Sequence, residues 1–110
     1  MKKIIAYRNY FNEFLKKLSE QEVFKILNSL DMLTQEEKVP RHYTKYIRDG
    51  LYEFRITYKN NEFRIFFIYD GNVLVVLFNG LKKKTQKLPN NEITKALKLK
   101  EEYYATKGNQ

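Results

Sequence analysis

Apolar side chains recur with a helical period in the first third of the chain. Phe11, Phe14, Leu15 and Leu18 follow the spacing i, i+3, i+4, i+7, which is typical of one face of a helix. A second helix is predicted after Ser19, because Glu22 follows it at the spacing of a capping box. The apolar residues that this second helix presents to the core are Val23, Ile26, Leu27, Leu30 and Leu33. We expect two antiparallel helices joined at Ser19.

The period changes to two in the second half of the chain. Leu51–Tyr58 alternates apolar and polar positions, while Phe63–Tyr69 and Val73–Phe78 are apolar at nearly every position. This pattern predicts three consecutive antiparallel strands. Turns are expected between them at Lys59-Asn60-Asn61 and at Asp70-Gly71. The Asp70-Gly71 pair suits a type I′ hairpin.

The remaining segments complete a single domain over residues 1–110. Ile4–Tyr7 fits either a short strand or the lead-in to the first helix, and Thr34–Asp49 reads as a basic loop. Pro89 precedes a last apolar stripe, which predicts a C-terminal helix. The expected fold is α+β, with an N-terminal helix pair packed on one face of a small antiparallel β-meander and a C-terminal helix. The other sheet face should then meet solvent or bind a partner.

Composition narrows the possible functions. A net charge of +8 on 110 residues favours an anionic partner, such as nucleic acid, an acidic protein or a membrane surface. The chain has no cysteine and one histidine, His42, so we expect no thiol catalysis, no metal and no cofactor. No segment approaches the roughly 18 apolar residues of a membrane span, and no signal peptide is recognisable. We therefore expect a soluble cytoplasmic protein without a membrane partner.

Basic residues in and after the strands are the candidates for chemistry. Arg55 lies on the polar face of its strand, and Arg64 interrupts an apolar strand, so across the hairpin the two could clamp a phosphate. A desolvated lysine among other cations can serve as a base. Arg55, Arg64, Lys82 and Lys83 are therefore the candidates for catalytic roles. Lys45, Arg48, Lys84 and Lys87 are further cations that could bind a phosphate backbone.

Each assignment has a structural alternative. Arg55 could form an ion pair with Glu53 or Glu62, and Arg64 could belong to a structural salt bridge. The lysines could bind phosphates without taking part in the chemistry. His42 is interpreted as a surface residue of the basic loop.

Five segments of the chain together have the pattern of a known superfamily. They are Asp49–Arg55, Phe63–Phe66, Val75–Lys87, Glu92–Leu97 and Glu101–Tyr104. Together they resemble the RelE/HigB superfamily, and in particular its phage-derived, HigB-like branch. The resemblance implies a toxin of a type II toxin–antitoxin pair that acts as a ribosome-dependent, metal-independent mRNA endonuclease and inhibits translation. The partners it implies are the ribosome, mRNA and a cognate helix-turn-helix antitoxin. With this resemblance, we expect the residues that bind RNA or the ribosome to be Lys45, Arg48, Lys84 and Lys87.

Two other functions fit the same sequence. A gyrase poison of the ParE kind would share the fold without cleaving RNA, and a non-catalytic RNA or ribosome binder would keep the basic surface alone. The closeness of the Lys82–Lys87 cluster to Arg55 and Arg64 favours a function on RNA.

Overall fold

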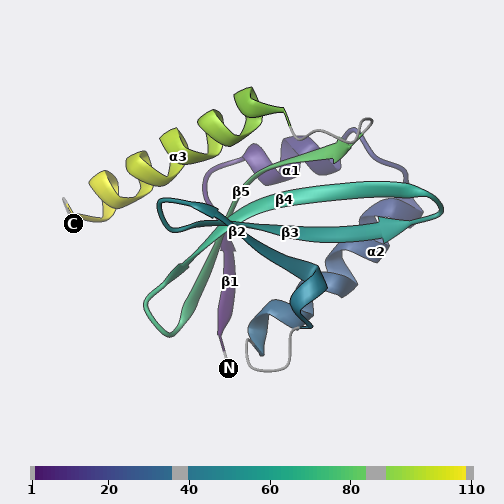
Figure 1. Cartoon of the computed structure of the whole chain (residues 1–110), viewed down its shortest axis with the longest axis horizontal. Coiled ribbons are helices and arrows are strands. Elements are labelled where there is room, and N and C mark those ends of the chain that lie inside the picture. Colours follow the sequence, from purple (N-terminus) through teal and green to yellow (C-terminus); the bar gives the residue numbers. More distant parts are fainter. Residues whose placement is uncertain (1, 36–39, 84–88, 109–110) are drawn as a thin grey trace.

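One mixed sheet of five strands organises the chain, in the order β1-β5-β4-β3-β2 (Figure 1). The structure is a computed structural model that describes residues 2–35, 40–83 and 89–108. The strands are β1 (Lys3–Ala6), β2 (Thr44–Arg48), β3 (Leu51–Tyr58), β4 (Asn61–Asp70) and β5 (Leu74–Lys83). β1 pairs with β5 in parallel, whereas the other neighbouring strands are antiparallel.

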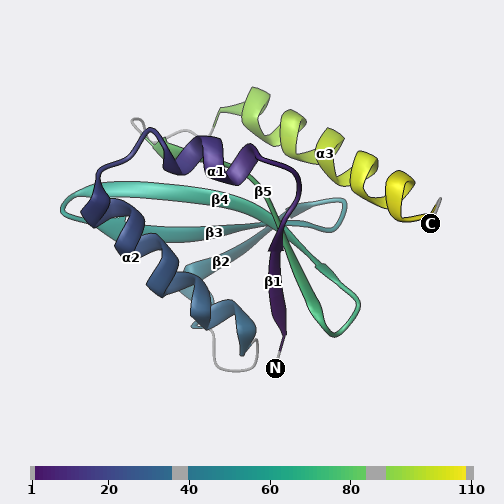
Figure 2. The same ribbon diagram turned by 180° about the vertical axis from the view of Figure 1, so that it is seen from behind.

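Helices cover both faces of this sheet. α1 (Tyr10–Leu15), α2 (Glu20–Leu30) and a 3₁₀ turn at Asp31–Thr34 follow β1, and Figure 2 shows α1 and α2 in front of the sheet. A second 3₁₀ turn, Arg41–Tyr43, leads into β2, and α3 (Asn90–Gly108) ends the chain. α3 packs on the opposite face, where Ala96 and Leu99 join a cluster of buried strand residues, Leu51, Phe66, Ile68, Val76 and Phe78. No helix in the described ranges is long and apolar enough to cross a membrane.

The predicted fold is wrong in its N-terminal half and in its sheet. The chain begins with a strand, so α1 and α2 do not form an N-terminal helix pair, and they contact β5 and β3. The sheet has five strands and is mixed, because β1 adds a parallel edge and β2 an antiparallel one. Both strands are short, most of their residues are exposed and none is buried, so neither shows a clear period of two. The open face is also partly covered, by α3.

The two hairpin turns differ from the predicted arrangement. Lys59 and Asn60 have φ of 48° and 68°, and their neighbours Tyr58 and Asn61 pair across the turn. Positive φ at both central residues is the mark of a type I′ turn, so that geometry belongs to the β3–β4 hairpin. Asp70 instead ends β4 and pairs with Leu74, which leaves a longer turn between β4 and β5.

The start of α2 follows the predicted capping box. The Glu22 backbone N–H donates to Ser19 Oγ at 3.2 Å, and the Ser19 N–H donates to Glu22 Oε1 at 2.9 Å. These bonds satisfy donors that a helix N-terminus otherwise leaves free. Ile26 and Leu30 are buried against the sheet as predicted, but Leu27 is 48% exposed.

Candidate anion-binding site

Two arginines lie opposite each other on the strands β3 and β4. Arg55 and Arg64 are Cα partners in the antiparallel register, which confirms the predicted proximity across the hairpin. Arg64 is buried, with 8% of its side chain exposed, whereas 35% of the Arg55 side chain is exposed. Like charges directly opposite each other in a sheet repel, so this pair requires a nearby anion.

Glu53 is the carboxylate between the two arginines. Its Oε1 lies 2.9 Å from Arg55 Nε and 3.5 Å from Arg64 Nε, and its side chain is almost fully buried. Arg64 Nη2 also donates to Glu62 Oε2 at 3.3 Å. The ion pairs that were the structural alternative for both arginines therefore exist. Within the described residues, no partner is seen for the terminal nitrogens of Arg55 or for the buried Oε2 of Glu53.

The two lysines at the end of β5 lie on opposite faces of the sheet. Lys83 Nζ is 3.9 Å from Glu62 Oε2, the oxygen that also accepts from Arg64, so this carboxylate links Lys83 to Arg64. Lys82 Nζ donates to Glu22 Oε2 on α2 at 3.1 Å and lies over the ring of Phe63. Successive side chains of a strand alternate between faces, which explains the separation. The structure therefore groups Lys83, and not Lys82, with Arg55 and Arg64.

Glu22 links the end of β5 to the start of α2. The hydrogen bond from the Ser19 backbone N–H lowers the pKa of Glu22 below its ordinary value, and the Lys82 ammonium lowers it further. Glu22 therefore stays ionised and holds Lys82 at the helix N-terminus. This is a structural role for Lys82.

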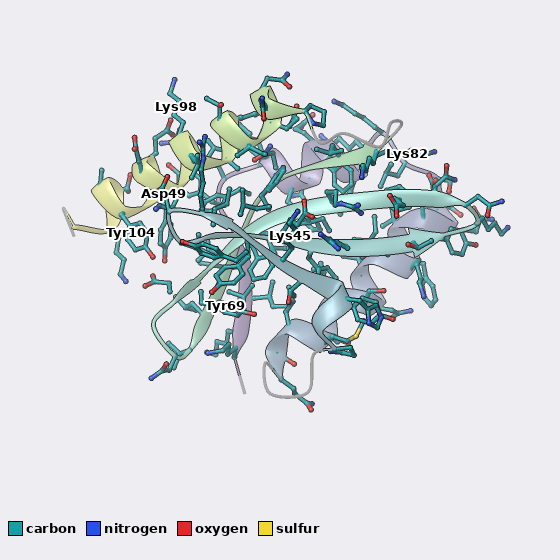
Figure 3. All side chains as sticks on the ribbon, in the orientation of Figure 1. Lys45, Asp49, Tyr69, Lys82, Lys98 and Tyr104 are labelled. Atoms are coloured by element: carbon teal, nitrogen blue, oxygen red, sulfur yellow. The ribbon has the colours of Figure 1, made fainter. Side chains whose placement is uncertain are left out.

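The predicted RNA-binding residues fall into two groups. Lys45 is exposed on β2 and lies opposite Glu53 in the register, so it borders the arginine cluster. Figure 3 labels Lys45 on β2, an edge strand of the sheet, and Lys82 at the end of β5. Arg48 is exposed at the end of β2, opposite Leu51. Lys84 and Lys87 lie outside the described residues.

A pocket of about 300 Å³ opens beside the arginines. The register between β2 and β3 ends at Thr44 and Phe54, and the pocket lies beside the next residues of β3. Residues from three further elements complete its wall: Lys25 of α2, His42 of the 3₁₀ turn, and Glu62 and Arg64 of β4, together with Arg55 itself. Three permanent cations thus face one carboxylate and one imidazole, a balance that suits an anion.

His42 is the residue whose position the sequence did not reveal. It is exposed, as predicted, and its ring lies 4.3 Å from that of Tyr43, but it also lines the pocket with Arg55 and Arg64. The only signal in the sequence is that His42 is the single histidine of a basic segment. An imidazole can both accept and donate a proton near neutral pH, so the pocket combines an anion site with a group suited to proton transfer.

The fold and this pocket define a small basic protein with a mixed sheet and an arginine-centred anion site. The model of the family described as phage-derived protein Gp49-like (DUF891) matches residues 13–101, a range that contains the whole arginine cluster. The chain therefore belongs to this family, which is one of type II toxin (RelE/HigB-like) proteins. No curated protein matches the chain in sequence.

Proposed function

We propose that this protein is the toxin of a type II toxin–antitoxin pair and that it cleaves mRNA on the ribosome without a metal ion. The observation that supports the proposal best is the pocket that brings His42, Arg55 and Arg64 together. Membership of the Gp49-like family supports the toxin part of the proposal. The ribosome and mRNA as partners, and the nuclease activity itself, are inferences from the chemistry of the pocket.

The reaction uses a nucleophile that RNA itself carries. The 2′-oxygen attacks the adjacent phosphorus, its proton passes to a base, and the bond from phosphorus to the 5′-oxygen breaks. The products are a 2′,3′-cyclic phosphate and a 5′-hydroxyl, which takes up one proton, so that atoms and charges balance. Such a reaction needs cations around the phosphorane and a group that exchanges protons.

The described residues can supply both requirements. Glu53 holds the Nε atoms of Arg55 and Arg64, which leaves the Arg55 terminal nitrogens available for a bidentate contact to the phosphate. Lys83 adds a cation beyond Glu62, and His42 is the candidate for proton transfer. Lys45, on β2, lies beside the cluster and suits a contact to the next phosphate along the RNA backbone.

Induced expression without antitoxin tests the proposal. Growth and protein synthesis should stop, and primer extension on translated mRNA should reveal new 5′ ends with 5′-hydroxyl groups. Arg55→Ala should reduce cleavage by about 10²-fold, whereas Lys98→Ala, on the exposed side of α3, should cleave at the wild-type rate. Arrest of DNA replication with intact mRNA would instead favour a gyrase poison, and ribosome binding without cleavage would favour a non-catalytic binder.

A further inference from the structure

Helix α2 exposes an aromatic side chain that the core does not use. Ile26 and Leu30 face the sheet, but Phe24 is 69% exposed, more than any other large apolar residue in the described chain. Phe24 lies in one row along the helix with Glu20 and Asn28, at i and i+4 spacing. Phe24 is thus an exposed aromatic residue between two polar ones, on a helix whose opposite face is buried against the sheet.

This row borders a groove of about 720 Å³. Glu20, Phe24 and Asn28 line it from α2, Met32 closes it at the following 3₁₀ turn, and Tyr58 at the end of β3 lines it from the sheet. The groove is larger than the arginine pocket and has room for several side chains. A groove of this size, with aromatic and thioether walls, suits the apolar side of an amphipathic helix.

The groove and the arginine pocket are adjacent. Lys25 and Ser29, one helix turn apart on α2, line both of them. A molecule bound in the groove therefore also touches the wall of the arginine pocket. The pocket side carries the cations Lys25, Arg55 and Arg64, which favour an acidic group on that side of the occupant. An occupant that matches both features has an apolar row flanked by carboxylates.

The charges of the groove itself distinguish a protein from RNA as the occupant. Its lining holds one cation, Lys25, and one anion, Glu20, which together give a phosphate backbone little attraction. The apolar walls, by contrast, gain free energy only when apolar side chains cover them. The groove therefore fits a protein segment and not a second stretch of nucleic acid.

We propose that the α2 groove is the docking site of the cognate antitoxin, and that an acidic amphipathic helix of the antitoxin fills it and extends a carboxylate to Arg55. This inference rests on the proposed toxin function. The antitoxin would then block the arginine pocket by direct competition with a substrate phosphate. Toxicity and neutralisation would depend on neighbouring but different residues.

Single substitutions in the groove separate these two properties. Phe24→Ser removes the aromatic wall, and Asn28→Arg places a bulky cation in the same row, on an exposed position that tolerates polar residues. Both variants should remain toxic alone and should escape neutralisation when the cognate antitoxin is co-expressed. The Kd of the purified antitoxin should rise by at least about tenfold. Matched controls are Leu27→Ser, on the same helix outside the groove, and Thr94→Arg, at an exposed position of α3.

Every outcome of this experiment bears on the docking site. Wild-type neutralisation and an unchanged Kd for both groove variants would overturn the proposal, as would equal losses in the two controls. Loss of toxicity by folded groove variants, checked by circular dichroism, would assign the groove to the ribosome or RNA instead. A wild-type protein that is not toxic contradicts the proposed function, while the Kd series still decides where the antitoxin binds.

Discussion

Arg55 and Arg64 face each other across adjacent strands and both direct their Nε atoms at one oxygen of Glu53. The arrangement places three charged groups on two adjacent inner strands of the sheet, with Lys45 opposite Glu53 and Glu62 beside Arg64. Glu53 compensates the repulsion between the arginines and orients both of them through the same side of each guanidinium. The anion site is therefore preorganised by a residue that a substrate does not need to touch.

Glu53→Gln should destabilise the protein more than any other single change in the cluster. The substitution removes the buried carboxylate beside Arg64 and leaves it only the half-exposed Glu62, and breaking such a buried pair costs about 3 kcal/mol. Urea denaturation gives the free energy of unfolding. Glu62→Gln is the matched control, because Glu62 is about half exposed, and its loss should cost less than about 1 kcal/mol. Equal losses for the two variants would show that Glu53 is not the centre of the cluster.

Lys83 and Lys82 should behave differently when either is replaced by alanine. Lys83 lies on the face of the arginines, so Lys83→Ala should slow cleavage at saturating ribosome concentration by about tenfold or more. Lys82 pairs with Glu22 on the other face, so Lys82→Ala should lower stability slightly and leave the saturated rate near that of the wild type. Single-turnover cleavage and a thermal melt of both variants measure these effects, and a rate loss confined to Lys82→Ala would contradict the assignment.

Gly80→Ala should destabilise the junction between β5 and α1. A Cβ at position 80 would lie 2.6 Å from Cδ2 of Phe14, a buried ring that packs on the same strand. Relief of this overlap requires movement of the ring or strand, at a cost of about 1–3 kcal/mol. Thermal denaturation measures the loss, and Phe14→Leu should reduce the additional effect of Gly80→Ala in the double variant. Full additivity of the two changes would argue against the predicted contact.

Acid should weaken the attachment of α3 to the sheet. Hydrogen bonds from Lys107 and Tyr103 lower the pKa of Asp70 in the folded protein. Because the folded pKa lies below the unfolded value, the stabilisation is present above about pH 4 and is lost as pH falls through the folded pKa. Urea denaturation from pH 7 to pH 2 should show this loss. Asp70→Asn should be less stable at pH 7 and should show a shallower decline in acid.

Alkali should weaken the same attachment, because it removes the proton that Tyr103 donates to Asp70. Burial, together with the Asp70 carboxylate, raises the pKa of Tyr103 to about 12. The stabilisation is therefore complete below about pH 10, the ordinary tyrosine pKa, and is lost as pH rises from there towards 12. Tyr103→Phe should remove this alkaline dependence, which absorbance of the phenolate can follow together with unfolding. An unchanged profile would show that Tyr103 does not bond Asp70.

The sequence predicted the elements whose signals are local. The strands β3, β4 and β5 follow a period of two or a continuous apolar run, and the start of α2 depends on two residues three positions apart. β2 was not predicted, and for β1 a short strand was one of two alternatives, because a short, exposed strand is defined by its neighbour in the sheet and not by its own pattern. The position of α3 on the opposite face depends on the same long-range pairing.

The candidate site divides in the same way. Arg55 and Arg64 were predictable neighbours, since a hairpin fixes which residues of its strands face each other. Lys82 and Lys83 were both candidates for catalysis, as residues just beyond a strand expected to end at Phe78. Instead β5 continues through both and places them on opposite faces. His42 reaches the pocket through the path of the 3₁₀ turn before β2, which leaves no trace in local periodicity.

Because β1 pairs in parallel with β5, the five-stranded sheet cannot form completely until β5 has been synthesised. Lys3 pairs with Leu74, so β1 has no strand partner until β5, the last of the five described strands, has been made. Contacts of such long sequence separation slow folding. The residues that line the α2 groove all precede β5 in the chain. All residues of the α2 groove are therefore synthesised before the strand that completes the sheet.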